Sequence, residues 1–170
     1  MTAPLRLRRA RQRGVAAVEF ALVSLLFFTV LFGILEFGRM LYVYNTLQEV
    51  TRRAAREAVV RWIDQGSTIR TLALFGAATL PGAPEIGAAN IRIEYLKKDG
   101  GVVDSPPLDP GDNLSACGDA TRTANCIDSV RVSVNNVVYT PAVGLFSMFS
   151  VALPASSVTM HAESLGFTVN

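Results

Sequence analysis

The chain has 170 residues, half of them hydrophobic, and a mean hydropathy of +0.33. This length allows one small domain and an anchor but no second independent core. Of the 16 basic residues, five lie before residue 14, and the other 11 are outnumbered by 14 acidic residues. The formal charge of +2 therefore gives no support to nucleic-acid binding, because the basic excess is confined to the N-terminus.

Residues 1–14 form a basic leader that ends in a glycine. The opposite side of the apolar segment that follows begins with an acid and a lone arginine, Glu36 and Arg39. The positive-inside rule therefore predicts a cytoplasmic N-terminus and an exported remainder. The residues that set this topology are Arg6, Arg8, Arg9, Arg11 and Arg13.

The next segment, 15–36, is predicted to be a transmembrane helix. From Val15 to Leu35 there are 21 residues with a single charge, that of Glu19. As a helix they span about 31 Å, close to the roughly 30 Å hydrocarbon thickness of a bilayer. An ordinary cleaved signal peptide fits poorly, because the apolar core is longer than about 15 residues and no A-x-A site follows it cleanly.

Glu19 lies inside the apolar segment and allows two interpretations. In a plain signal anchor, its carboxylate snorkels to the interface or pairs with a leader arginine. Alternatively, a cut after Gly14 removes every leader arginine and leaves Val15 as a new amino terminus. The new ammonium group of a neighbouring subunit then pairs with Glu19, which sets the axial register between helices in an assembly.

The segment "VAAVEFALV" after the basic leader and glycine resembles the class III signal of type IV pilins and pseudopilins, which prepilin peptidase cuts after the glycine. The continuation "LFGILEFGRMLYVYNTLQEVTRRAAREAVV" is similar to the TadE-like proteins of the tight adherence system. This resemblance covers roughly the first third of the chain. It implies a minor pseudopilin that is processed between Gly14 and Val15, is registered by Glu19 with Phe20 as packing companion, and acts in assembly or priming of an adhesive type IVb pilus.

The same resemblance implies the partners and the location. The partners are prepilin peptidase, other pilins and pseudopilins that contact the N-terminal helix, and the inner-membrane pilus assembly platform. The location is the bacterial inner membrane, with a single pass and a periplasmic C-terminal domain; whether the protein enters the pilus stays open. The alternative is an unprocessed, signal-anchored periplasmic binding or scaffold protein.

Residues 37–65 are predicted to continue the helix into the periplasm. The segment has no proline, and Gly66 is the expected C-terminal cap. Charged residues form helix-compatible pairs, namely Glu49 with Arg53, Arg53 with Glu57, and Glu57 with Arg61. An apolar stripe at three- and four-residue spacing consists of Leu47, Val50, Ala54, Ala58 and Trp62.

Residues 66–170 are predicted to form a periplasmic α+β head. A short helix is expected at 68–75, and a Gly-, Ala- and Pro-rich connection follows it to residue 89. The segments 90–96, 129–139 and 157–164 alternate apolar with polar side chains and predict strands. The fold expected is pilin-like, with the long helix covering one face of a small antiparallel sheet of about three or four strands and the other face wet.

Two loops separate these strands. The acidic loop 97–126 is expected to be solvated, and its two cysteines, Cys117 and Cys126, are expected to form a disulfide in an oxidising compartment. The apolar segment 140–154 is too short to span a bilayer. It either covers the sheet edge or forms a subunit contact.

The sequence has none of the common catalytic motifs, and His161 is its single histidine. The aspartates of the acidic loop do not have the spacing of an EF-hand. We therefore expect no enzyme activity, no cofactor and no metal site.

Overall fold

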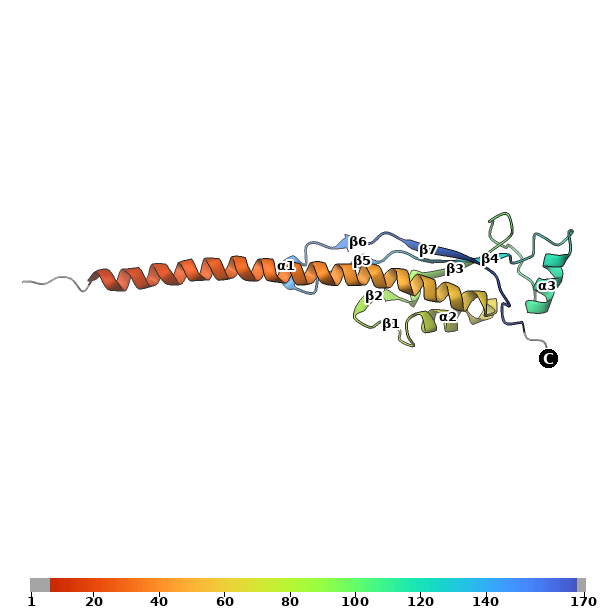
Figure 1. The fold of residues 1–170 in the computed structure, drawn as a ribbon, viewed down its shortest axis with the longest axis horizontal. Coiled ribbons are helices and arrows are strands. Elements are labelled where there is room, and N and C mark those ends of the chain that lie inside the picture. The colour runs from red at the N-terminus through yellow and green to blue at the C-terminus, as the bar shows by residue number, and fades with distance from the viewer. Residues whose placement is uncertain (1–6, 168–170) are drawn as a thin grey trace, which may run out of the picture.

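The computed structural model describes residues 7–167, with side chains described from residue 14 onward. Arg6 lies outside these residues, as do the side chains of Arg8, Arg9, Arg11 and Arg13. One long helix carries an α+β head around its C-terminal half (Figure 1). This helix, α1, runs from Leu7 to Val59 over 53 residues, about 80 Å at 1.5 Å per residue. The predicted fold class is confirmed.

The C-terminal half of α1 packs on the head through the predicted stripe. Four of its predicted members are fully or almost fully buried, namely Leu47, Val50, Ala54 and Ala58, and Val43, one turn before Leu47, extends the buried face. Trp62, the last residue expected in the stripe, lies beyond the helix in extended backbone, with φ −69° and ψ 157°. Of the three predicted ion pairs, the side chains described show Glu57 with Arg61, at 2.9 Å, and Arg53 lies over the Phe75 ring instead.

The helix ends at Val59 and not near residue 64 as expected. The reason is a tertiary contact, because the backbone N–H groups of Glu163 and Leu165 donate to the Val59 carbonyl at 3.2 and 3.1 Å. Gly66 does not cap α1. With φ −56° it is the first residue of the next α-helix.

A helical turn and a small hairpin follow α1. The turn η1 (Ile63–Gln65) leads into α2 (Gly66–Ala73), which confirms the short helix expected at 68–75. The connection expected after it contains an antiparallel hairpin, β1 (Thr79–Leu80) and β2 (Ala83–Gly87). Pro81 and Gly82 form its turn, and the positive φ of Gly82, 78°, is the conformation that a type II turn requires at this position.

The main sheet confirms the three predicted strand segments and their faces. After η2 (Ala88–Asn90), β3 (Ile91–Leu96) pairs with β4 (Ser129–Val134), and β4 pairs with β7 (Ser156–His161), all antiparallel. One row across the sheet is Ile93, Val132 and Val158, and it belongs to the core shared with α1. The opposite face carries exposed residues such as Arg92 and Thr159.

Strands β4 and β7 continue beyond the main sheet as one hairpin. The extensions are β5 (Val138–Tyr139) and β6 (Val151–Ala152), joined through the turn η3 (Gly144–Phe146). They keep the register of β4 and β7, and Leu153 N–H donates to the Val137 carbonyl between the two pairs at 2.9 Å. The hairpin therefore runs beside α1 toward its bare N-terminal part (Figure 1).

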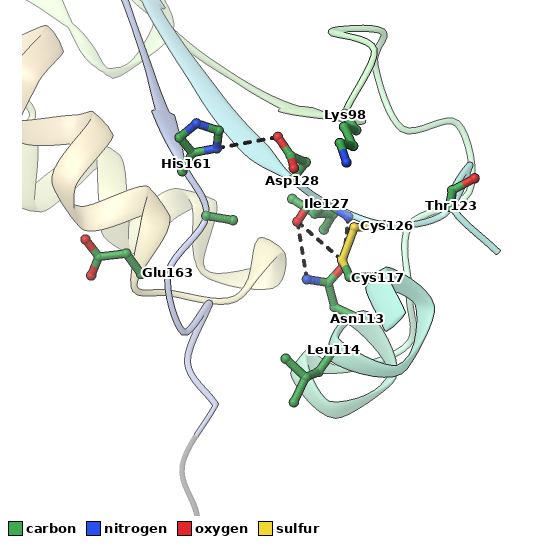
Figure 2. Close-up of a pocket in the computed structure, with 11 residues that line it drawn as sticks. Lys98, Asn113, Leu114, Cys117, Thr123, Cys126, Ile127, Asp128, His161 and Glu163 are labelled. Carbon is green, nitrogen blue, oxygen red and sulfur yellow. Dashed lines mark hydrogen bonds and ion pairs between the residues drawn. A yellow bond between two sulfur atoms is a disulfide. The ribbon is translucent and has the colours of Figure 1, made fainter. Parts of the chain in front are cut away.

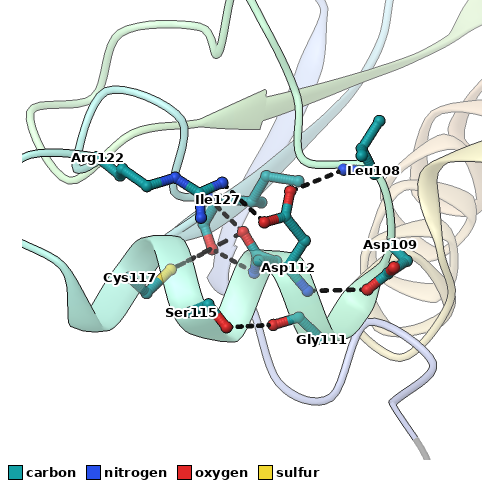
Figure 3. Close-up of polar contacts among 9 residues, drawn as sticks. Leu108, Asp109, Gly111, Asp112, Ser115, Cys117, Arg122 and Ile127 are labelled. Atoms are coloured by element: carbon teal, nitrogen blue, oxygen red, sulfur yellow. Dashed lines mark hydrogen bonds and ion pairs between the residues drawn. The ribbon is translucent and has the colours of Figure 1, made fainter.

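The acidic loop is not entirely irregular, because it contains α3 (Pro110–Gly118). Asp109 caps the helix by accepting from Asp112 N–H at 2.8 Å, and Pro110 occupies the first turn (Figure 3). The predicted disulfide joins Cys117 of α3 to Cys126. It fixes α3 close to the start of β4.

Candidate functional site

The residues predicted to be processed and to register subunits lie together near the N-terminal end of α1. Gly14, Val15, Glu19 and Phe20 are all exposed, Phe20 by 74%. A Cβ at Gly14 would meet no heavy atom within 4 Å. Among residues 14–167, no side chain forms an ion pair or hydrogen bond with Glu19. This end of the helix is free of the head.

Apart from Glu19, the surface of α1 between residues 14 and 35 is largely apolar and mostly uncovered. Large side chains are exposed around the whole helix, not along one stripe, and include Val18, Leu22, Leu26, Phe27, Val30 and Ile34. By length and composition, α1 is able to cross a membrane. Because an all-round apolar helix needs an apolar environment, this segment is a candidate membrane anchor.

The uncovered segment ends at Glu36, whose carboxylate is held by the β5–β6 hairpin. The Tyr139 hydroxyl donates to Glu36 Oε2, and Val143 N–H donates to Oε1 at 2.6 Å. The Tyr139 hydroxyl also lies 3.1 Å from the Glu36 carbonyl oxygen. Glu36 is 8% exposed and Tyr139 2%, so both groups are withdrawn from water. Burial, with Glu36 adding to it, raises the pKa of Tyr139.

Arg39, one helical turn later, joins two segments of the head. Its guanidinium forms an ion pair with Glu85 of β2 and donates to the Thr140 carbonyl at 2.9 Å. It also lies 5.0 Å from the centre of the Tyr139 ring. Glu36 and Arg39 together therefore fasten β2 and the β5–β6 hairpin to the helix where the bare segment ends.

Sequence reasoning missed this contact. It treated Glu36 and Arg39 as charges that report topology, whereas the structure uses them to hold the head. The available signal was a carboxylate directly after an apolar run, since such a group needs a partner. That partner, Tyr139, is 103 residues away and leaves no local pattern.

The comparison with protein families matches the same part of the chain. Residues 14–56 match the family described as TadE-like protein. This segment is TadE-like. The family resemblance seen in the sequence is thus confirmed over these residues, and it indicates a protein related to the Tad pilus. No curated protein and no solved structure matches the chain.

The TadE-like segment contains both structural parts of α1. It begins at Gly14, includes the whole candidate anchor, and continues through Glu36 and Arg39 into the buried stripe. The residues that meet this stripe and these two charges, such as Tyr139 and Glu85, lie outside the match. The match therefore covers most of the helix and none of the strands of the head.

An open pocket of about 400 Å³ lies at the other end of the molecule, beside the disulfide (Figure 2). Asn113 lines it and uses its side-chain amide to accept from Ile127 N–H at 2.8 Å. His161 faces Asp128 at 3.5 Å across its rim, with the imidazole 90% exposed. An exposed pair of this kind is a weak surface contact. Within the described residues no three His, Cys, Asp or Glu side chains are placed to share a metal ion.

The aspartates of the acidic loop serve local structure. Asp112 accepts from Leu108 N–H at 3.1 Å and from the Arg122 guanidinium at 2.7 Å (Figure 3). The Arg122 contact lowers the pKa of Asp112. Asp119 accepts from Thr121, whose contact lowers the pKa of that carboxyl. Asp112 and Asp119 therefore stabilise turns, and Asp109 caps the start of α3.

Proposed function

We propose that the chain is a TadE-like minor pseudopilin that prepilin peptidase cuts after Gly14. In this proposal residues 15–36 hold it in the bacterial inner membrane, with the N-terminus cytoplasmic and the head periplasmic. It acts as a structural component in assembly or priming of an adhesive type IVb pilus. Its partners are the peptidase, other pilins and pseudopilins, and the inner-membrane assembly platform.

The observation that carries this proposal is the division of α1 at Glu36. Between Val15 and Leu35 the helix is apolar on all sides except at Glu19 and touches little of the head, and after Glu36 one face is buried in the core. A helix built in this way presents its N-terminal half to lipid or to neighbouring helices and keeps its head beside them. This is the geometry that packing of pilin helices requires, and the family match begins at Gly14 itself.

Glu19 is the residue proposed to register neighbouring subunits. A carboxylate inside hydrocarbon costs at least about 2.5 kcal/mol unless it is paired. A cut after Gly14 creates an ammonium group at Val15, which a neighbouring helix offers to Glu19 at one axial offset. Phe20, 74% exposed, packs beside that contact. The leader arginines act before the cut, by fixing the topology.

The test of processing compares two glycines of the same helix. A Cβ at Gly14 or at Gly38 meets no heavy atom within 4 Å, so a side chain at either position begins in open space. In a host with the peptidase, we expect the intact mass of the membrane-extracted protein to lack residues 1–14. Gly14→Val retains them, and Gly38→Val loses them as the native chain does. Retention of residues 1–14 in the native chain would support the unprocessed scaffold protein instead.

Registration is tested separately, with Glu19→Ala. We expect cleavage to proceed and pilus assembly to fall, because the processed amino group no longer finds its partner. Glu49→Ala, which removes an acid from the part of α1 that carries the head, serves as the control and leaves assembly unchanged. Normal pili with Glu19→Ala would contradict the pairing without affecting the evidence for processing.

A further inference from the structure

The turn between β5 and β6 exposes apolar side chains that the core does not use. We call residues 143–151 the hairpin tip. Leu145, Met148, Phe149 and Val151 are exposed there by 57%, 81%, 61% and 44%. The hairpin tip lies within a stretch from residue 132 to residue 160 that has no charged residue. A contiguous exposed apolar patch of this kind is typical of an interaction surface.

The hairpin tip is fixed beside the last turn of the candidate membrane anchor. A Cβ on Gly33 would lie 3.7 Å from Phe146 Cζ, and Val143 N–H donates to Glu36 at 2.6 Å. Gly33 precedes Glu36 by three residues, about 4.5 Å along the helix axis. The exposed side chains of the hairpin tip therefore lie at the depth where the anchor leaves the membrane.

We propose that the hairpin tip inserts into the interfacial layer of the membrane that α1 crosses, on the side of the head. This inference depends on the proposed anchoring of α1. Leucine, methionine and phenylalanine without neighbouring charges are suited to the boundary between headgroups and acyl chains. The patch is also continuous with the exposed apolar surface of α1, which already faces lipid in the proposed function.

Several backbone polar groups of the hairpin tip form hydrogen bonds within the turn and so do not need water as a partner. Phe146 N–H donates to the Val143 carbonyl at 2.9 Å, and Phe149 N–H donates to the Phe146 carbonyl at 2.9 Å. The Ser147 hydroxyl donates to the Gly144 carbonyl at 2.9 Å. Polar groups paired within the turn lower the cost of leaving water.

Insertion gives the protein a second membrane contact and explains the position of Glu36. With the hairpin tip in the interface, the Glu36 carboxylate lies under Tyr139 and Val143, which supply the hydrogen bonds that water would otherwise make. The two contacts together fix the depth and rotation of α1, and so the height at which Glu19 lies within the bilayer.

The test places tryptophan at three positions of the full-length protein in lipid vesicles. Trp62 is the single tryptophan, so Trp62→Phe provides the background, with thermal unfolding to verify the fold. Phe149→Trp probes the hairpin tip, and Leu26→Trp in α1 is the positive control. Leu108→Trp, at an 89% exposed residue beside α3, is the negative control. Fluorescence quenching is measured with phosphatidylcholines brominated at different depths of the acyl chain.

We expect lipids brominated near the headgroups to quench Phe149→Trp, lipids brominated near the bilayer centre to quench Leu26→Trp, and neither to quench Leu108→Trp. If Leu26→Trp is quenched and Phe149→Trp is not, the proposed insertion of the hairpin tip is wrong and the membrane anchoring of α1 is still supported. An unquenched but blue-shifted Phe149→Trp would assign the patch to a second copy of the chain. An unquenched Leu26→Trp would overturn the anchor and the insertion together. Met148→Trp, at an 81% exposed residue, replaces Phe149→Trp if that variant does not fold.

Discussion

Tyr139→Phe tests whether the hydrogen bond to Glu36 holds the hairpin on α1. The substitution removes one hydroxyl from a residue that is 2% exposed and leaves the ring in place. Hydrogen bonds to charged groups contribute about 1.5 to 3 kcal/mol, and the carboxylate left behind is itself buried. We therefore expect the free energy of unfolding of the head to fall by about 1.5 to 3 kcal/mol.

The assay is urea denaturation of the full chain in detergent, followed by the fluorescence of Trp62, which packs against the core of the head. Tyr42→Phe is the matched control, because its hydroxyl makes an exposed contact with the Pro81 carbonyl at 3.3 Å. In a Glu36→Gln background the cost of Tyr139→Phe shrinks, because the charged partner is gone. Equal stability of Tyr139→Phe and Tyr42→Phe would refute the role given to the contact.

Two further predictions concern the head. The Tyr95 hydroxyl is buried without a hydrogen-bond partner among the described residues, and burial raises its pKa to about 12. Because a raised pKa favours the neutral hydroxyl in the fold, stability is complete below about pH 10 and declines toward pH 12. Tyr95→Phe keeps or increases stability at pH 7 and lessens this alkaline loss, and unchanged alkaline sensitivity would contradict the burial argument. Replacing Cys117 and Cys126 by serine is expected to lower the free energy of unfolding by about 2.5 to 3 kcal/mol, because the disulfide closes a short loop. The measurement is the urea midpoint, which should fall, and reduction of the native protein should lower it by the same amount. An unchanged midpoint would show that the disulfide adds no stability.

Periodic patterns predicted the parts of the fold that depend on neighbouring residues. Val130, Val132 and Val134 alternate with polar residues, and all three are fully buried in β4. The stripe on α1 was predicted for the same reason, since three- and four-residue spacing places its members on one face. These elements follow from side chains a few residues apart.

Features that depend on distant residues could not be predicted in this way. The end of α1 is set by backbone donors of Glu163 and Leu165, and nothing near Val59 indicates them. The contact of Tyr139 with Glu36 likewise joins residues that are far apart in the sequence. By contrast, α3 had a local signal, because Asp109 followed by Pro110 is typical of a helix start, and it was overlooked within a loop rich in turn residues.

Glu19 and Glu36, the two acids in and directly after the apolar segment of α1, differ in how their carboxylates find partners. Each lies where a carboxylate without a partner is costly. The chain itself satisfies Glu36, through Tyr139 and Val143. Glu19 has no such partner among residues 14–167, and the hairpin ends beside Gly33, well short of it. In the proposed function the Val15 ammonium group of a neighbouring chain supplies the positive charge for Glu19, which would make this acid useful for assembly and not only tolerable.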